Sequence, residues 1–176
     1  MQFNVSSFLR APTGAVREYE IDDDVKIDDA PAAARHRLRG RARMDRTTDG
    51  ILVRAEMRSH LDAECSRCLR AVKVPVVLEF EEEYLPIVDV TTGARVQIPE
   101  GREDAYRINE LHILDLEVAA RQYWTMTEPM APLCREDCPG LCPVCGEDMS
   151  KTGHACTADE IDARWSKLAE LRSSRP

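Results

Sequence analysis

Seven cysteines are the residues of this chain whose type and spacing could do chemistry. Five lie in its last quarter, in Cys-Arg-Glu-Asp-Cys-Pro-Gly-Leu-Cys-Pro-Val-Cys-Gly from residue 134 and in His-Ala-Cys from residue 154; the other two form Cys-Ser-Arg-Cys at 65–68. Together with His154 they make eight soft ligands, the number that two tetrahedral zinc ions need. The predicted ligands form four pairs in chain order: Cys65 with Cys68, Cys134 with Cys138, Cys142 with Cys145, and His154 with Cys156.

Structural zinc explains these residues better than disulfides do. The number of thiols is odd, the chain opens without a signal-peptide pattern, and paired Cys-x-x-Cys units in a cytosolic chain are typical of metal sites. Gly146 and Pro143 suit the tight turn around the third pair. No spacing resembles a ferredoxin cluster motif, and His154 has an alternative interpretation as an exposed loop histidine.

Four ligand pairs can be divided between two sites in three ways. One division joins the first pair to the second, and the third to the fourth, which closes a short loop around the second ion. Another places the second and third pairs around one ion and leaves the first pair to the fourth. Spacing alone leaves these divisions open.

Composition indicates one compact domain, or one with a small appendage, in a chain of 176 residues. Its 43% apolar residues suffice for a core, and no apolar run approaches the roughly 20 residues that span a bilayer. We therefore expect a cytoplasmic protein. The net charge of −8 argues against a generic nucleic-acid coat, which would be basic.

A strict alternation over residues 34–46 predicts a strand with five arginines on one face. A turn at 47–50 and an apolar alternation from Ile51 predict that this strand forms a β-hairpin with the next one. After the turn at 65–68, Val72 to Phe80 predicts a third antiparallel strand. The arginines expected on the shared outer face are Arg35, Arg37, Arg39, Arg41, Arg43, Arg54 and Arg58.

Two interpretations of this arginine face remain open. Side chains of one parity repeat every 6.6–6.8 Å, close to the phosphate spacing of a nucleic-acid strand, and guanidinium groups bind phosphate in a bidentate manner. Alternatively, the arginines pair with carboxylates on neighbouring strands, namely Glu56, Glu79, Glu81 and Glu83.

The remaining segments complete an α+β prediction. Ala15 to Ile21 has weak strand character and is expected to end at Asp22-Asp23-Asp24, whereas residues 86–107 look like a long surface loop. Asp115 is a plausible N-cap for a helix that runs up to Pro129 and covers the antiparallel sheet. We expect a domain at 1–129, and packed on it a zinc-ribbon-like segment at 130–176 whose final helix follows a capping box at 157–160.

Catalysis has little support in the sequence. It contains no glycine-rich phosphate loop, nucleophile elbow or His-Glu-x-x-His motif, and eight closed zinc ligands leave no open coordination position. The expected protein is therefore a binding scaffold and not an enzyme.

Several segments together resemble a known family. They are Phe-Asn-Val-Ser-Ser-Phe-Leu-Arg at 3–10, Cys-Ser-Arg-Cys-Leu at 65–69, Leu-Asp-Leu at 114–116, the cysteine run from Pro132, and Asp-Ala-Arg-Trp at 162–165. This pattern is similar to the YceD-like large ribosomal RNA accumulation proteins. The fourth pair departs from the family's usual Cys-x-Cys in having His154. A branch of the family that keeps only the first two pairs would favour the division that joins them.

The resemblance implies a factor for synthesis, processing or accumulation of large-subunit ribosomal RNA. The expected cofactor is zinc, in two ions. The expected partners are the RNA precursor or a basic large-subunit ribosomal protein, with no membrane and no small-molecule substrate. The alternative is a thiol-based redox or metal-sensing regulator.

Overall fold

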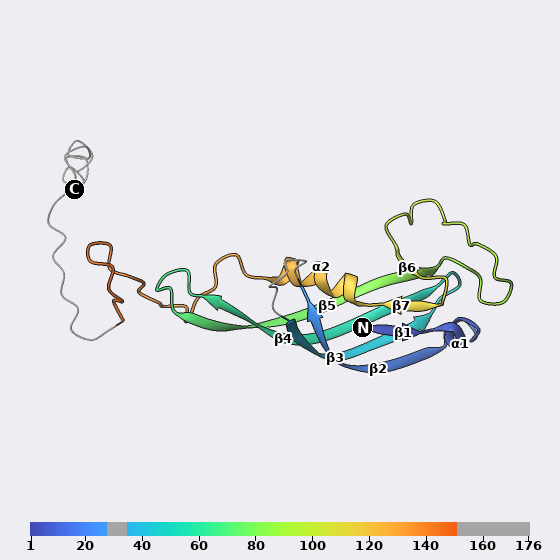
Figure 1. The fold of residues 1–176 in the computed structure, drawn as a ribbon, viewed down its shortest axis with the longest axis horizontal. Helices are drawn as coiled ribbons and strands as arrows, with labels where there is room; N and C mark the ends of the chain where they lie inside the picture. The colour runs from blue at the N-terminus through green and yellow to red at the C-terminus, as the bar shows by residue number, and fades with distance from the viewer. Residues whose placement is uncertain (28–34, 151–176) are drawn as a thin grey trace, which may run out of the picture. The chain divides into compact units, whose positions relative to one another are not determined.

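The structure, a computed structural model, describes residues 1–27 and 35–150. It has the expected α+β architecture, with mostly antiparallel strands and few helices (Figure 1). One sheet has the strand order β2-β3-β4-β5-β6, and β1 pairs with β7 in a second, two-stranded sheet. The strands are β1 (Gln2–Asn4), β2 (Val16–Lys26), β3 (Arg35–Arg46), β4 (Ile51–Glu64), β5 (Ala71–Pro86), β6 (Tyr106–Ile108) and β7 (Ile113–Asp115), and the helices are α1 (Ser6–Leu9) and α2 (Glu117–Thr127).

Buried apolar and exposed polar side chains alternate along the strands of the five-stranded sheet, which gives the sheet one apolar face. On β3, Leu38, Ala42 and Met44 are buried, and the arginines between them are exposed. On β4, the buried apolar side chains are Ile51, Val53, Ala55 and Met57, so the inward face continues from β3 to β4. β4 pairs antiparallel with β3, as the sequence predicted, and β2 pairs antiparallel with the other edge of β3, which the sequence did not predict.

The core continues from the sheet onto α2. Ala119, Ala120 and Trp124 are the buried residues of this helix and belong to the same apolar cluster as the strand residues. The ring of Trp124 lies 4.4 Å from that of His36, centroid to centroid. At the start of α2 the N-cap is Leu116, one residue beyond the predicted Asp115. The Asp115 carboxylate nevertheless accepts a 2.8 Å hydrogen bond from the backbone N–H of Glu117.

β2 runs further than the sequence predicted. Asp22, Asp23 and Asp24 continue the strand as far as Lys26, although carboxylates disfavour strands in isolation. Their register explains the difference, because Asp22 lies opposite Arg39 and Asp24 opposite Arg37 on β3. Opposite charges directly across an antiparallel pair stabilise it.

The sheet also gains a strand that the sequence did not predict. β5 extends as far as Pro86, and the three-residue β6 pairs parallel with its end. Between these strands the chain forms the expected long loop, with an isolated bridge between Val88 and Arg95. The helix predicted after residue 157 lies outside the described residues.

The chain divides into two compact units. The first comprises Met1–Ala63 and Lys73–Met130, and the second joins Glu64–Val72 to the chain from Ala131 onward. The second unit therefore combines the turn between β4 and β5 with a segment more than 60 residues later. Among the described residues, no helix has the length and apolar character needed to cross a membrane.

We predict a pH-dependent contribution from Asp22. Hydrogen bonds from Arg37 lower the pKa of this carboxyl group to about 2. A lowered pKa stabilises the fold above the unfolded value of 3.8, and this contribution is lost as the pH falls towards 2. Asp22→Asn should therefore lower the melting temperature at pH 7 and leave it nearly unchanged at pH 2, as measured by thermal unfolding.

The matched control is Asp23→Asn on the same strand. Asp23 is exposed and makes no ion pair in the described part of the chain. Its replacement should change the melting temperature little at either pH. Equal shifts for Asp22→Asn at pH 7 and pH 2 would contradict the ion-pair explanation.

Candidate metal centre

Four thiols from the two segments of the second unit converge on one point. The sulfur atoms of Cys65, Cys68, Cys134 and Cys138 all lie within 4.8 Å of one another. The Sγ atoms of Cys65 and Cys138 are 3.9 Å apart, and those of Cys68 and Cys134 are 3.7 Å apart. A tetrahedron with zinc–sulfur distances of about 2.3 Å has sulfur–sulfur edges of about 3.8 Å. The cluster therefore has the dimensions of a tetrathiolate zinc site.

Backbone hydrogen bonds position the four sulfurs. The Cys65 N–H donates to Arg70 O at 2.8 Å, and the Leu69 N–H donates to Cys65 O at 2.9 Å, which closes the turn that carries the first pair. Leu69 adopts a left-handed conformation with φ of 58° to complete it. The Ser66 N–H also donates to Pro132 O at 2.8 Å. This hydrogen bond holds the turn against the segment that precedes Cys134.

Two arginines surround the cluster. The Arg67 side chain donates a hydrogen bond of 2.9 Å to the carbonyl oxygen of Cys138. The Arg70 Nε donates to the Cys68 sulfur at 3.4 Å and lies 3.3 Å from the Asp148 carboxylate. Arg70 thus offsets negative charge on the thiolates and links them to the segment that follows the third pair.

The protonation of the thiols depends on these contacts. Hydrogen bonds from backbone N–H groups, first that of Cys134, lower the pKa of Cys65 to about 6. A hydrogen bond from Arg70 lowers the pKa of Cys68, whereas burial raises the pKa of Cys134 to about 12. Four thiolates in such close contact repel one another unless a cation neutralises them, so a bound divalent ion would displace the remaining protons.

Burial makes the cluster a closed site. Cys65 is fully buried, Cys68 is 4% exposed and Cys138 is 2% exposed, whereas Cys134 is half-buried, and Leu133 and Leu141 pack beside them. None of the four forms a disulfide. A buried tetrahedral set with no position for water is typical of structural zinc and not of catalytic zinc.

The third pair forms a second turn of the same kind. The Val144 N–H donates to the Cys142 sulfur at 3.4 Å, and the Gly146 N–H donates to Cys142 O at 2.9 Å. Gly146 has a φ of 76°, the conformation that the sequence pattern predicted for it. The predicted partners of this pair, His154 and Cys156, lie outside the described residues.

The positions of the cysteines are relevant to the three ways of dividing the ligand pairs between two ions. The structure brings the first and second pairs together, as in the first of the three divisions, and Cys142 and Cys145 are not among the four sulfurs that converge. The assignment of all eight residues as zinc ligands stays a prediction. Sequence reasoning missed Arg67 and Arg70, because nothing in the spacing shows which charged side chains face the thiols.

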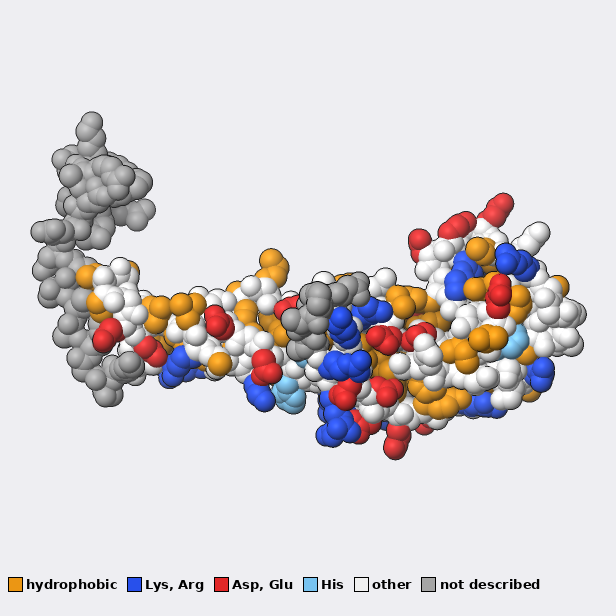
Figure 2. All heavy atoms as spheres, in the orientation of Figure 1, with side chains coloured by type: hydrophobic (Ala, Val, Ile, Leu, Met, Phe, Trp, Pro, Cys, Tyr) orange, Lys and Arg blue, Asp and Glu red, His pale blue; other side chains and the backbone are white. Residues whose placement is uncertain are grey.

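The predicted arginine face exists as one exposed surface. Residues 35, 37, 39, 41 and 43 are exposed on β3, and the register places Arg54 opposite Arg43 and Arg58 opposite Arg39. Six of these seven arginines lie within 4.0 Å of a carboxylate, and Arg35 makes no ion pair with a described residue. Figure 2 shows basic and acidic side chains interspersed over the sheet.

Most of the carboxylates that pair with this face are not among the partners that the sequence predicted. Glu56 and Glu81 were expected, but Asp22 binds both Arg37 and Arg39, and Asp45 binds both Arg43 and Arg54. The missed signal is an acidic alternation on β2 at residues 18, 20, 22 and 24, which has the same period as the arginines. Each of these acids lies directly opposite an arginine of β3.

Comparison with known proteins places most of the chain in a described family. Residues 53–172 match the family described as large ribosomal RNA subunit accumulation protein YceD. All the predicted zinc ligands lie inside the matched region, whereas the arginine strand β3 lies before it.

Curated relatives occur in mycobacteria. Uncharacterized proteins of Mycobacterium bovis and Mycobacterium tuberculosis are each 32% identical over 130 residues, and one of Mycobacterium leprae is 31% identical over the same length. These alignments cover 73% of this chain but only 59% of the first two relatives and 56% of the third. The chain therefore matches less than two thirds of the length of these relatives. No solved structure matches it.

We predict that Gly140 is needed for the cluster to close. Gly140 has a φ of 82°, and a Cβ there would lie 3.2 Å from Arg67 O in the turn of the first pair. Gly140→Ala should separate the two segments and accelerate alkylation of Cys65 and Cys138 in metal-free, reduced protein. Peptide mapping after timed alkylation measures this rate for each cysteine.

Gly146→Ala is the matched control. Gly146 has a similar φ of 76°, but a Cβ there meets nothing within 4 Å. Both variants carry the same backbone strain, and only the first also introduces a steric conflict with the turn. Equal alkylation rates at Cys65 in the two variants would refute the role assigned to Gly140.

Proposed function

The chain belongs to the YceD family of large ribosomal RNA subunit accumulation proteins, and on this premise we propose that it is a non-enzymatic factor for the synthesis, processing or accumulation of large-subunit ribosomal RNA. The observation that carries the proposal is the convergence of four thiols on the geometry of a closed structural zinc site, inside the region that matches the family. A closed site stabilises a binding surface and offers no open coordination position for a substrate.

Zinc is the ion that suits these residues best. Thiolate ligands select soft or borderline cations, and tetrahedral four-sulfur sites are typical of zinc and of iron–sulfur proteins. Cys65, Cys68, Cys134 and Cys138 would hold one ion, and Cys142, Cys145, His154 and Cys156 would hold the second. Each ion would supply the folding free energy that a segment poor in large apolar side chains lacks.

The partners follow from the family and from the charge. We propose that the protein acts in the cytoplasm on the precursor of the large-subunit ribosomal RNA, on a basic protein of the large subunit, or on both. A net charge of −8 favours a basic partner. The name of the family points to the RNA.

A thiol-based regulator is the second candidate. The lowered pKa of Cys65 and Cys68 favours it, because thiolates are the reactive form of cysteine. Their burial opposes it, because sensor cysteines must be accessible. Slow alkylation of the first two pairs that becomes fast only after a chelator is added would exclude this candidate.

The central test measures the zinc content of the purified chain and the ratio of ribosomal RNAs in cells. The purified chain should hold about two zinc ions, and the double variant Cys65→Ser, Cys68→Ser should lose one of them. In cells that lack the chain, the wild type should restore the ratio of large-subunit to small-subunit ribosomal RNA, and this variant should not. Elemental analysis and RNA quantification are the two readouts.

The control for this test is Ser66→Ala. Ser66 lies between the two replaced cysteines and is not a predicted ligand. It should keep both ions and restore the RNA ratio. A zinc count that the double variant does not change would remove the proposed site, whereas unchanged ribosomal RNA in cells without the chain would remove the proposed function.

Whether the arginine face contacts RNA or serves only to pair neighbouring strands has its own test. Because the arginines are paired across strands, we expect the triple variant Arg37→Gln, Arg39→Gln, Arg41→Gln to lower the melting temperature and to leave RNA affinity unchanged. If the face binds RNA instead, affinity should fall and the salt slope should flatten by about 0.7 for each lost phosphate contact. Filter binding at several salt concentrations, together with thermal unfolding, separates these outcomes.

A further inference from the structure

The turn that carries the first cysteine pair contacts more than the other cysteines of the cluster. This turn, at 65–70, also meets the hairpin at 140–150 that carries the third pair. In the hairpin, Leu141 and Asp148 lie opposite each other as an antiparallel bridge, one on each arm. Each of these two residues is bound to the turn, so the turn holds both arms of the hairpin.

The first arm is fixed through Leu141. Its N–H donates to Arg67 O at 3.1 Å, and its side chain packs beside the buried cysteines of the cluster. The next residue is Cys142, the first cysteine of the third pair, which is also buried. Because Leu141 directly precedes Cys142, closure of the first site also fixes the backbone that presents this thiol.

The second arm is fixed through Arg70. Its Nε atom lies 3.3 Å from the Asp148 carboxylate, and its Nη2 atom donates to the Ser150 hydroxyl at 3.1 Å. The same Nε atom donates to the Cys68 sulfur at 3.4 Å. The Asp148 side chain is only 14% exposed, so solvent screens this ion pair less than it screens a fully exposed pair. One guanidinium group therefore contacts both a ligand of the first site and the arm that follows the third pair.

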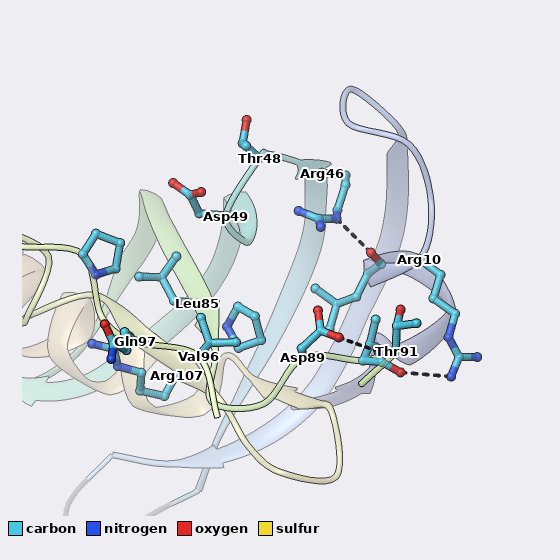
Figure 3. A pocket seen from close by; sticks show the side chains of 14 residues that line it. Arg10, Arg46, Thr48, Asp49, Leu85, Asp89, Thr91, Val96, Gln97 and Arg107 are labelled. Atoms are coloured by element: carbon cyan, nitrogen blue, oxygen red, sulfur yellow. Dashed lines mark hydrogen bonds between the residues drawn. The ribbon is translucent and has the colours of Figure 1, made fainter. Parts of the chain in front are cut away.

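A hollow of about 460 Å³ in the first unit shows no such convergence among its described residues. Figure 3 shows Arg46 and Arg107 at opposite ends of this hollow, and Arg10 is bound to Val90 O. The Asp89 carboxylate lines the same hollow. Its charged groups do not meet at one point, whereas those around Arg70 do.

We propose that the two zinc sites are coupled, so that metal in one strengthens binding at the other, and that Arg70 is the residue that links them. This inference rests on the two zinc ions proposed above. A metal site must order its ligands before it binds, which costs conformational entropy. Because closure of the first site already fixes both arms of the hairpin, less of this cost remains for the third pair. The effect is reciprocal, so metal at the third pair strengthens the first site by the same factor.

The test measures this effect at the first site. Full-length protein is alkylated briefly at a series of buffered free-zinc concentrations, and peptide mapping gives the concentration that protects half of the Cys134 thiol. Cys134 is the half-buried member of the cluster and therefore its most accessible thiol. The proteins compared are the wild type, Arg70→Gln, the double variant Cys142→Ser, Cys145→Ser, and this double variant combined with Arg70→Gln.

The factor by which loss of the third pair raises the half-protecting zinc concentration is the coupling factor. It should be about tenfold with Arg70 present and at most about threefold with Arg70→Gln, where only the contact of Leu141 remains. Arg70→Gln also removes a hydrogen bond to Cys68, but this loss is common to both proteins that carry the substitution and cancels in the factor. A merely structural role of Arg70 would therefore lower zinc affinity without changing the coupling factor.

Arg67→Gln is the matched control. Arg67 lies in the same turn, and its side chain donates to Glu136 O and Cys138 O, which belong to the segment of the second pair. The backbone carbonyl group that accepts the Leu141 N–H is kept in this variant. Arg67→Gln should therefore retain a coupling factor of about tenfold, even if the affinity of the first site falls.

A coupling factor near one with Arg70 present, or a factor that Arg70→Gln leaves unchanged, would overturn the inference while both zinc sites remain. If Arg70→Gln binds no zinc at the cluster, Asp148→Asn takes its place, because it removes the same ion pair and keeps the hydrogen bond to Cys68. A wild-type Cys134 thiol that zinc does not protect would overturn the proposed zinc site as well as the coupling. The two failures are therefore distinguishable.

Discussion

The crowding of four sulfur atoms within 4.8 Å is the constraint on which the second unit depends. Two segments more than 60 residues apart in the chain meet there, with few large apolar side chains around them. Thiolates at this distance repel one another, and buried thiols without a cation offer little binding energy. A tetrahedral cation would turn the same arrangement from a repulsive contact into the interaction that closes the unit. The hydrogen bonds of Arg67 to Cys138 O and of Arg70 to the Cys68 sulfur orient the cysteines.

Electrostatics organises the first unit in a different way. Arginines on β3 lie opposite acids on β2. Glu56 forms an ion pair with Arg41, and Asp45 and Glu81 form ion pairs with Arg54. Each exposed pair contributes little by itself, on the order of 0–1 kcal/mol, so the pairs reinforce a strand register that the buried apolar face specifies.

Local patterns predicted the strands well. The alternations on β3 and β4 identified the buried and the exposed faces residue by residue, because one buried face leaves only one register possible. The sequence-based prediction failed at Asp22–Asp24 of β2. There, cross-strand pairing with Arg37 and Arg39 overrides the weak preference of aspartate against β-strands. Spacing predicted eight zinc ligands but could not divide them, since each of the three divisions gives four ligands to each ion. Nor could the charged neighbours of the thiols be predicted, because Arg67 and Arg70 reach Cys138 and Asp148 only through the tertiary fold.

X-ray absorption at the zinc edge tests the central claim most directly. The double variant Cys142→Ser, Cys145→Ser leaves the cluster of Cys65, Cys68, Cys134 and Cys138 as the complete four-sulfur site. Its bound zinc should show four sulfur neighbours at about 2.3 Å and no lighter ligand. A spectrum with two or fewer sulfurs, or with nitrogen and oxygen neighbours at about 2.0–2.1 Å, would contradict a tetrathiolate centre formed by the two segments.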